Sequence, residues 1–401
     1  MQDQLSNPLV MSEYEYVLKT TKGRARLAIL SFYFIQGLGF ASWASRIPDI
    51  KTSLSMSEAA LGTVLFAPAL GQLAAMPVSG AWVAKYGSIR MLAIAMVLYC
   101  FILVTLGLAV NSTMLFVSLF FFGLCSNFLN IAVNTQGLRM EEIYGRPIMS
   151  SFHGGWSFAC ALSSVFALSI APFRIEPYIH FIIIAIVMLG LMVFRLKDLI
   201  PDPPKKNTEQ KETIFKKPEL LLVQLGLIGF FGMCSEGAMF DWSGVYFKEV
   251  VHAPEMITVM GFTIVMTFMA IGRFLTDKLS VRIGKKRVLQ LGGILIFTGL
   301  MISVLFPYLI PSAIGFMIVG FGISSIVPTI YSIAGRNTKG SPSIALTIVS
   351  SVSFFGFLLG PPIIGYIAEL TNLRYSYAVV SMFGLSITLL VSLIKSLKHV
   401  R

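Results

Sequence analysis

The sequence predicts an all-α membrane protein whose twelve transmembrane helices form two pseudo-symmetric six-helix bundles. Of the 401 residues, 56% are hydrophobic and only 12% are charged, and the mean hydropathy is +0.80. A soluble fold does not need so much apolar surface. The apolar residues gather in twelve runs that are long enough for helices crossing a bilayer and too long for barrel strands. One long polar segment separates the first six runs from the last six.

These runs set the order of the predicted elements. They lie at 26–47, 58–84, 89–110, 113–138, 148–171, 177–195, 219–247, 255–276, 286–307, 311–334, 342–368 and 375–394. The corresponding divisions are an N-terminal tail (1–24), an N-terminal bundle (25–196), a linker (197–217), a C-terminal bundle (218–396) and a C-terminal tail (397–401). We expect the polar N-terminal tail to be disordered up to Lys19, and Pro48 to break the first helix.

The distribution of positive charge predicts the orientation. If the N-terminus is cytoplasmic, 25 of the 31 Lys and Arg residues fall on the cytoplasmic side, as the positive-inside rule requires. Both termini and the linker are then cytoplasmic. The net charge of +12 therefore indicates membrane topology, and we expect no nucleic-acid partner. Arg46, at the outer end of the first run, is expected to extend its side chain to the surface.

The sequence contains none of the signatures of enzymes or metal sites. Cys100, Cys125, Cys160 and Cys234 all fall within apolar runs without ligand-like spacing, which is typical of small buried hydrophobic residues. Neither a nucleophile elbow nor a nucleotide-binding loop is present. We expect no enzymatic activity and no cofactor.

Two carboxylates interrupt the seventh run, in the segment GMCSEGAMFDWSGVYF at 232–247. Glu236 lies close to the predicted middle of the bilayer, where an ionised side chain is costly and usually marks a substrate or proton path. We therefore predict that Glu236 couples transport to protons. Asp241, nearer the outer surface, is a second candidate, with an outer gate or a structural hydrogen-bond partner as the alternative. His153 is a third because histidine titrates near neutral pH, and it could instead hydrogen-bond the solute or be a packed structural donor. The alternative for Glu236 is a structural acid held by a neighbouring helix.

Amide side chains line one face of the fourth run. Asn127, Asn130 and Asn134 are spaced i, i+3 and i+7, which places them on one side of a helix. Amides offer both donors and acceptors and suit a hydroxylated neutral solute. The alternative is that they join neighbouring helices.

Further candidate solute-binding residues are polar or aromatic positions within the runs. They are Gln36, Gln72, Trp156, Trp242 and Tyr331. The two glutamines lie near mid-depth beside glycines, and Trp156 could stack on a sugar ring. Core packing is the alternative for Trp156.

Two loops in corresponding positions of the halves carry a repeated motif. They read GAWVAKYGSIR (80–90) and GRFLTDKLSVRIGKKR (272–287). Both resemble the signature loop of the major facilitator superfamily, in which a Gly and an Asp precede a basic, aromatic and Gly group and a cluster of cations. The first loop has Ala84 where the signature has Asp. The second keeps Arg273 and Asp277, which we expect to pair at i, i+4 and to act in gating. Lys85 and Arg90 are further gating candidates, or simple cytoplasmic anchors.

Four more segments are similar to the fucose permease-related branch of that superfamily. They are FASWASRIPDIK, SSFHGGWS, CSEGAMFDWS and FGFLLGPPIIGYIAE. The resemblance implies the major facilitator fold in the bacterial inner (plasma) membrane, and coupled transport of a small polar, sugar-like solute with protons. We expect a monomer whose partners are the solute, protons and the lipid bilayer. Proton-driven efflux of drug-like or cationic compounds is the alternative, and a non-transporting receptor is a third possibility.

Overall fold

The computed structural model describes residues 8–144, 148–202, 219–337 and 342–394, and within these ranges it describes all side chains except those at 8–21, 150, 277, 336–337, 342–344 and 347. The described part of the chain is helical and contains no strand. The fold is therefore the predicted all-α membrane architecture.

Twelve long helices make up the described fold. The N-terminal six are α1 (Pro8–Ser53), α2 (Glu58–Tyr86), α3 (Ser88–Gly107), α4 (Ser112–Tyr144), α5 (Met149–Ile170) and α6 (Pro177–Leu196). The C-terminal six are α7 (Leu220–Glu249), α8 (Met260–Ile283), α9 (Lys285–Leu305), α10 (Leu309–Asn337), α11 (Pro342–Leu370) and α12 (Leu373–Leu393). By length and composition, each set contributes six helices able to cross a membrane.

The packing of the N-terminal six helices is repeated by the C-terminal six. α1 packs on α5 and α6, α2 on α4, and α3 on α4 and α6. Likewise α7 packs on α11 and α12, α8 on α10, and α9 on α10 and α12. This correspondence is the structural form of the weak sequence repeat, and it defines two bundles with the same internal arrangement.

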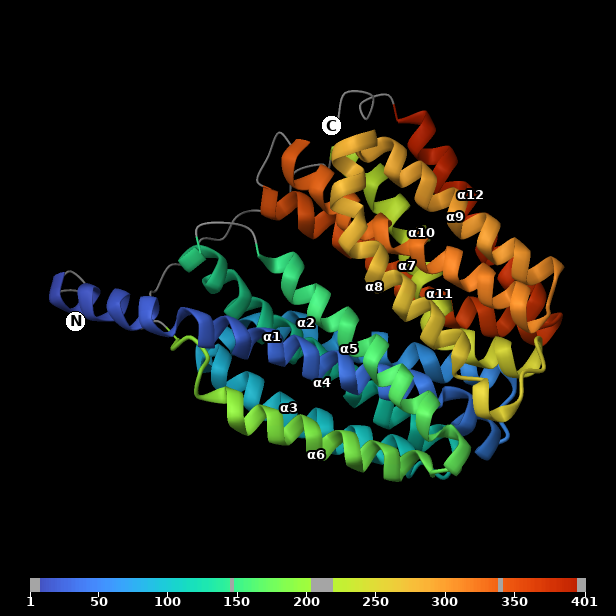
Figure 1. The fold of residues 1–401 in the computed structure, drawn as a ribbon, viewed down its shortest axis with the longest axis horizontal. Coiled ribbons are helices and arrows are strands. Elements are labelled where there is room, and N and C mark those ends of the chain that lie inside the picture. Colours follow the sequence, from blue (N-terminus) through green and yellow to red (C-terminus); the bar gives the residue numbers. More distant parts are fainter. Residues whose placement is uncertain (1–7, 145–147, 203–218, 338–341, 395–401) are drawn as a thin grey trace.

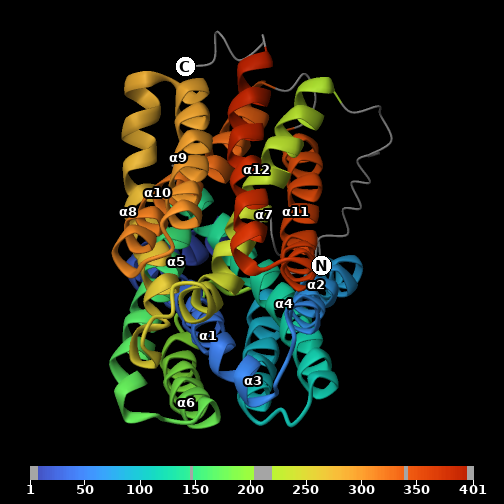
Figure 2. The same cartoon turned by 90° about the vertical axis from the view of Figure 1, so that its right-hand side faces the viewer.

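The two bundles meet along three helix pairs, α2 with α11, α5 with α8, and α1 with α7. Figure 1 shows them converging at the end that carries the α1–α2 and α7–α8 connections and diverging toward the end where both termini lie. Figure 2 views the molecule from the converging end. We call these the closed end and the terminal end.

Close packing inside each bundle depends on glycine. A Cβ atom at Gly71 of α2 would overlap the carbonyl oxygen of Phe120 in α4, and one at Gly123 of α4 would overlap that of Pro68 in α2. Gly356 of α11 meets the carbonyl of Phe230 in α7 in the same way. Small residues let helix backbones approach closely, which strengthens packing where lipid removes the hydrophobic driving force.

The outward faces of the bundles expose large apolar side chains. Phe101 of α3 is 67% exposed, and Ile186 and Phe194 of α6 are 65% and 72% exposed. In water such a surface would be unfavourable, but it suits contact with hydrocarbon.

The first helix differs from prediction at both ends. The segment expected to be disordered up to Lys19 is helical from Pro8, and Pro48 lies inside α1, which continues to Ser53. The prediction that Pro48 breaks the helix is wrong because a proline in a buried helix is tolerated when neighbouring helices pack around it. Here the ring of Pro48 packs against Gly244 of α7, leaving no room for a Cβ.

Candidate functional site

Glu236 and Arg273 form an ion pair on the side of the C-terminal bundle that faces the N-terminal bundle. Glu236 is 7% exposed, and its Oε1 accepts a hydrogen bond from Nη2 of Arg273 in α8 at 3.2 Å. Nη1 of the same guanidinium donates to the hydroxyl of Ser157 in α5. Arg273 therefore links three helices and both bundles.

The predicted pairing of Arg273 with Asp277 stays a prediction, because the side chain of Asp277 lies outside the described residues. What the structure adds is Glu236 as a partner of Arg273. The sequence did not suggest this pair because the two residues lie on different helices, 37 positions apart. The role of Ser157 was also missed, although it lies one turn after His153 on the same helix face, where its hydroxyl donates to the His153 carbonyl at 3.1 Å.

His153 adjoins this cluster. Its side chain is exposed, and its ring meets Tyr33 of α1 edge-on with centroids 5.1 Å apart. It also lies within electrostatic range of Arg273. Tyr331 of α10, half-buried, lies within electrostatic range of Glu236. Two of the predicted polar residues, His153 and Tyr331, thus stand beside the Glu236–Arg273 pair.

The amides of α4 divide into two kinds. The Nδ2 of Asn134 donates to Oδ1 of Asn130 at 2.5 Å, and Oδ1 of Asn134 accepts from the hydroxyl of Tyr33. Asn130 is exposed and Asn134 half-buried, so both can meet a solute. Asn127 is buried at 6% exposure, and its Oδ1 has no hydrogen-bond partner among the described residues.

The two predicted glutamines occupy different surroundings. Gln36 is buried between α1 and α4, where its Nε2 donates to the Ser126 carbonyl at 3.3 Å. This contact joins α1 to α4. Gln72 is half-buried on α2.

Aromatic side chains from both bundles meet close to the ion pair. Phe40 of α1 lies 5.6 Å from Trp156 and 5.3 Å from Phe240 of α7, measured between ring centroids. Phe240 is 6.5 Å from Phe357 of α11. We call these four residues the aromatic layer. Trp156 is only half-buried in it, so part of its ring is free for another contact.

Asp241 and Trp242 lie deeper in the C-terminal bundle. Asp241 is 8% exposed, and its carboxyl group makes no hydrogen bond or ion pair with any described residue; Tyr377 of α12 lies within electrostatic range of it. Trp242 is fully buried, and its indole nitrogen has no acceptor among the described residues. Trp242 is thus placed in the core, away from accessible space.

Polar contacts hold the closed end together. Lys51, at the end of α1, pairs with Glu58 of α2 at 2.5 Å and with Glu249 at the end of α7. Nζ of Lys248 donates to the Thr52 hydroxyl at 2.6 Å. Glu369 of α11 accepts from the amide of Ala59 at the start of α2, at 3.1 Å. Polar contacts therefore join α1 to α7 and α2 to α11 across the bundles at this end.

Arg46 is a correction to the expectation of a surface-reaching side chain. It is 5% exposed, its Nε donates to Nδ1 of His180 in α6 at 3.1 Å, and its Nη1 pairs with Asp49 at 2.7 Å. The partners inside the N-terminal bundle compensate the charge, so the side chain need not reach water.

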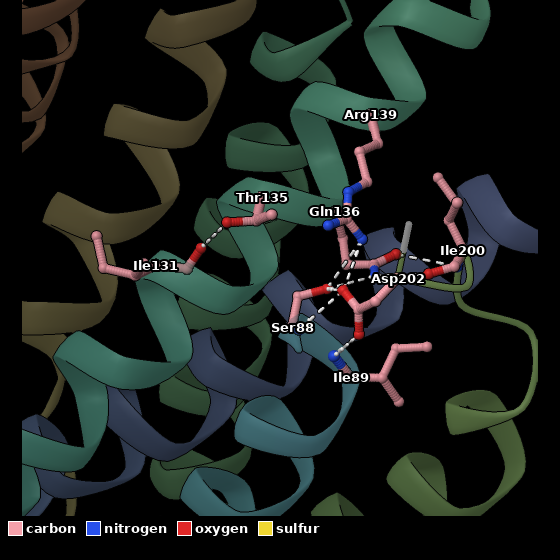
Figure 3. Close-up of polar contacts among 8 residues, drawn as sticks. All are labelled: Ser88, Ile89, Ile131, Thr135, Gln136, Arg139, Ile200 and Asp202. Atoms are coloured by element: carbon pink, nitrogen blue, oxygen red, sulfur yellow. Dashed lines mark hydrogen bonds and ion pairs between the residues drawn. The ribbon is translucent and has the colours of Figure 1, made fainter. Parts of the chain in front are cut away.

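The terminal end of the N-terminal bundle holds the start of the linker (Figure 3). Oδ1 of Asp202 accepts from the amide and hydroxyl of Ser88 at 2.9 and 2.6 Å, and its Oδ2 accepts from the Ile89 amide at 3.2 Å. Arg139 of α4 pairs with Asp202 at 2.7 Å. Gln136 makes two hydrogen bonds with the backbone of Ile200. We call this arrangement the linker clamp.

The clamp supplies a carboxylate where the first signature loop has none. Gly87, with φ of 93°, turns the chain so that Asp202 caps the N-terminus of α3, and a Cβ at Gly87 would lie 2.5 Å from Oδ2 of Asp202. Burial alone would raise the pKa of Asp202, but the hydrogen bonds from Ser88, Arg139 and Ile89 outweigh it and hold the pKa below its ordinary value. The predicted gating residues Lys85 and Arg90 are exposed beside this loop.

Comparison with known proteins identifies the family. A model described as Major Facilitator Superfamily matches residues 29–343. An uncharacterized MFS-type transporter of Yersinia pestis is 27% identical over 355 residues, covering 88% of this chain and 92% of the relative. The membrane protein MosC of Rhizobium meliloti is 28% identical over 348 residues, covering 86% of this chain and 84% of the relative.

Solved structures agree on the fold. The crystal structure of a mutant of the nucleoside transporter NupG matches with a TM-score of 0.74 at 13% identity, covering 92% of this chain and 99% of that one. A bacterial homolog of the human lysosomal transporter Spinster, in an inward-facing and occupied conformation, also matches with a TM-score of 0.74 at 14% identity. The match covers 92% of this chain and 96% of that one. The family model covers most of the chain, and the repeated bundles have the matching fold: this chain belongs to the major facilitator superfamily of membrane transporters.

Proposed function

We propose that this protein is a secondary active transporter that moves a small, polar, sugar-like solute together with a proton by alternating access. The observation that carries the proposal is the Glu236–Arg273 ion pair on the face of the C-terminal bundle toward the N-terminal bundle, with Nη2 and Oε1 3.2 Å apart. Charged groups within a membrane are costly and are kept where they serve a substrate or proton path. Glu236 is then the group that exchanges a proton as its pairing with Arg273 changes.

Amide and aromatic side chains of the N-terminal bundle support a hydroxylated molecule as the solute. Asn130 and Asn134 present amide groups that both donate and accept hydrogen bonds. The half-buried ring of Trp156 offers an apolar face for a sugar ring. These groups come from the N-terminal bundle, whereas Glu236 and Arg273 come from the C-terminal bundle. A solute bound between them would contact both moving parts.

The contacts at the closed end support an inward-facing state. Positive charges concentrate on the side of the termini, which favours a cytoplasmic location for the terminal end. The ion pair of Lys51 and Glu249 then seals the outer side, and the bundles diverge toward the cytoplasm. Outward opening requires these contacts to break while the bundles close at the terminal end.

Uptake into proteoliposomes tests the proposal. A panel of radiolabelled sugars and sugar derivatives is offered with an imposed inward proton gradient, and uphill accumulation is measured for the wild type and for Glu236→Gln. We expect the wild type to accumulate a solute and acidify the lumen, whereas Glu236→Gln should permit exchange of solute without accumulation. Accumulation by the variant at the wild-type level would refute the coupling role, and gradient-driven expulsion of cationic dyes without sugar uptake would favour efflux.

A further inference from the structure

Arg273 carries a permanent positive charge on the face of the C-terminal bundle toward the N-terminal bundle, and its partners among the described side chains do not take all of its donors. A guanidinium has five N–H donors. One Nη1 donor goes to Ser157 and one Nη2 donor to Glu236. The side chain remains 23% exposed, compared with 10% for that of Glu236. No described side chain takes the remaining donors, and the exposed part of the guanidinium can be reached by a group that enters from the accessible space.

The chemistry that best matches these donors is a carboxylate. The planar guanidinium presents two parallel donors that fit the two oxygens of a carboxylate, and such charge-assisted hydrogen bonds are about twice as strong as neutral ones. The hydroxyl of a neutral sugar gains much less from the same contact. The amides of Asn130 and Asn134, which are connected to His153 through Tyr33, and the partly open ring of Trp156 suit the hydroxyl groups and ring of the rest of the molecule.

We propose that the solute is a sugar acid, a small polyhydroxylated molecule bearing one carboxylate, and that this carboxylate takes the place of Glu236 on Arg273 while Glu236 takes up a proton. The proposal rests on the proposed function, and it names the solute class and the step that links solute to proton. The proton comes from the outer water, is held on an Oε atom of Glu236, and leaves to the cytoplasm when Glu236 pairs with Arg273 again.

Charge balance gives the physical reason for the link. The charges of Glu236 and Arg273 compensate each other while the two side chains are paired. A second carboxylate on the same guanidinium would leave one uncompensated negative charge in the membrane interior, which is strongly unfavourable. Protonation of Glu236 removes that charge. One anion and one proton then cross together, and transport carries no net charge.

Among the described titratable and charged groups around Glu236, Arg273 is the one that forms an ion pair with it. Arg273 faces it from α8, Tyr331 from α10 and Cys160 from α5, and His153 of α5 stands beside Arg273. Asp241 lies farther along α7 and faces Tyr377 of α12.

Binding to the purified full-length transporter tests this inference. Hexuronates and aldonates are each compared with their neutral parent sugars by calorimetry or thermal shift, from mildly acidic to mildly alkaline pH. We expect the acids to bind at least about tenfold more tightly than the neutral parents. Their affinity should weaken as pH rises, by up to about tenfold per pH unit, the limit for one coupled proton.

Three variants separate the outcomes. Arg273→Gln should abolish the preference for the acid. Glu236→Gln, which resembles the protonated side chain, should bind the acid with no dependence on pH. Arg195→Gln, which removes an arginine paired with Asp198 at the end of α6, is the matched control and should behave as the wild type.

Each result has a defined meaning. Equal binding of acids and neutral sugars, or a pH dependence that persists in Glu236→Gln, overturns the inference and leaves the proposed function standing. The measurement of pH dependence in Glu236→Gln tests the inference even if Arg273→Gln fails to fold. If no sugar of either kind binds the wild type, the proposed sugar-like solute itself is refuted.

Discussion

Lys51, the last charged residue of α1, forms an ion pair with Glu249, the last residue of α7, and thereby joins the two bundles at their closed end. Lys51 also pairs with Glu58 at 2.5 Å, but that contact stays within the N-terminal bundle. Its side chain is only 9% exposed, so the pair is screened less by salt than a surface pair. Separation of the bundles at the closed end would therefore break the contact of Lys51 with Glu249 but not its contact with Glu58.

The first prediction is that Glu249→Gln shifts the transporter toward the outward-facing state. Losing the interbundle ion pair lowers the cost of separating α1 from α7 at the closed end. The measurement is labelling of a cysteine at Asn130 by a membrane-impermeant maleimide applied from outside, which should become several-fold faster. The four native cysteines are buried. Asp49→Asn, which removes an ion pair that stays within α1 near the same end, is the matched control, and equal labelling of the two variants would show that the Lys51–Glu249 pair does not hold the closed end shut.

The second prediction concerns the linker clamp. Asp202→Asn should lower the stability of the transporter at neutral pH by about 1 kcal/mol, the usual effect of losing a helix cap. Because the folded-state pKa of Asp202 is depressed, its contribution is full above the unfolded pKa of about 3.9 and is lost as pH falls through the folded value. The apparent Tm of variant and wild type should therefore converge only in strong acid.

Asp198→Asn provides the comparison for Asp202. Its carboxylate lies 3.7 Å from Arg195 in an i, i+3 pair, and such pairs contribute about 0.5 kcal/mol or less. If Asp198→Asn lowers the Tm as much as Asp202→Asn does, removal of any acid near the linker has this effect. The hydrogen bonds of the linker clamp would then not explain the loss of stability.

The third prediction is that Gly123→Ala impairs folding, whereas Gly80→Ala does not. A methyl group at Gly123 would overlap the Pro68 carbonyl and force α4 away from α2, at a cost of about 1–3 kcal/mol or more. Gly80 has nothing within 4 Å of the position that a methyl group would take, although it belongs to the signature-like loop. The yield and apparent Tm of each purified variant are compared with those of the wild type. Equal losses in Gly123→Ala and Gly80→Ala would contradict the packing argument.

Much of the fold could be predicted from the sequence because each transmembrane helix is a local pattern. Twelve apolar runs predicted twelve helices, and the polar linker predicted the division into bundles. The details of α1 were not predictable in this way. Pro48 stays inside the helix because Gly244 of α7 accommodates its ring, and Arg46 is buried because His180 of α6 accepts its hydrogen bond. Both facts depend on helices that are distant in sequence.

The candidate site shows the same limit. Glu236, His153 and the asparagines were recognisable as polar interruptions of apolar runs, and Glu236 and His153 lie beside Arg273, which joins the two bundles. Their partners were not recognisable. Arg273 was assigned to its helical neighbour Asp277, since i, i+4 spacing is visible in a sequence and a contact across 37 positions is not. Asp202 was overlooked for the same reason, because its partner Ser88 lies 114 positions away.

The fourth prediction separates two amides on the same helix face. Asn130→Ala should weaken solute binding by about tenfold, the effect of losing one hydrogen bond in a site, with little change in Tm, because Asn130 is exposed. Asn127→Ala should leave binding close to that of the wild type, since Asn127 is buried. Both are measured by solute titration of purified protein. Stronger loss of binding in Asn127→Ala than in Asn130→Ala would reverse the assignment.

The fifth prediction is that Asp241→Asn retains proton-coupled accumulation that Glu236→Gln loses. Both carboxylates are buried on α7, but only Glu236 has a permanent cation with which pairing and protonation can alternate. Asp241 has no ionic partner among the described residues, and an asparagine fills nearly the same volume without requiring one. The measurement is uphill uptake into proteoliposomes with an imposed proton gradient, alongside solute exchange without a gradient. If Asp241→Asn exchanges solute but cannot accumulate it, while Glu236→Gln accumulates normally, the coupling proton is carried by Asp241 and the role of the ion pair is structural.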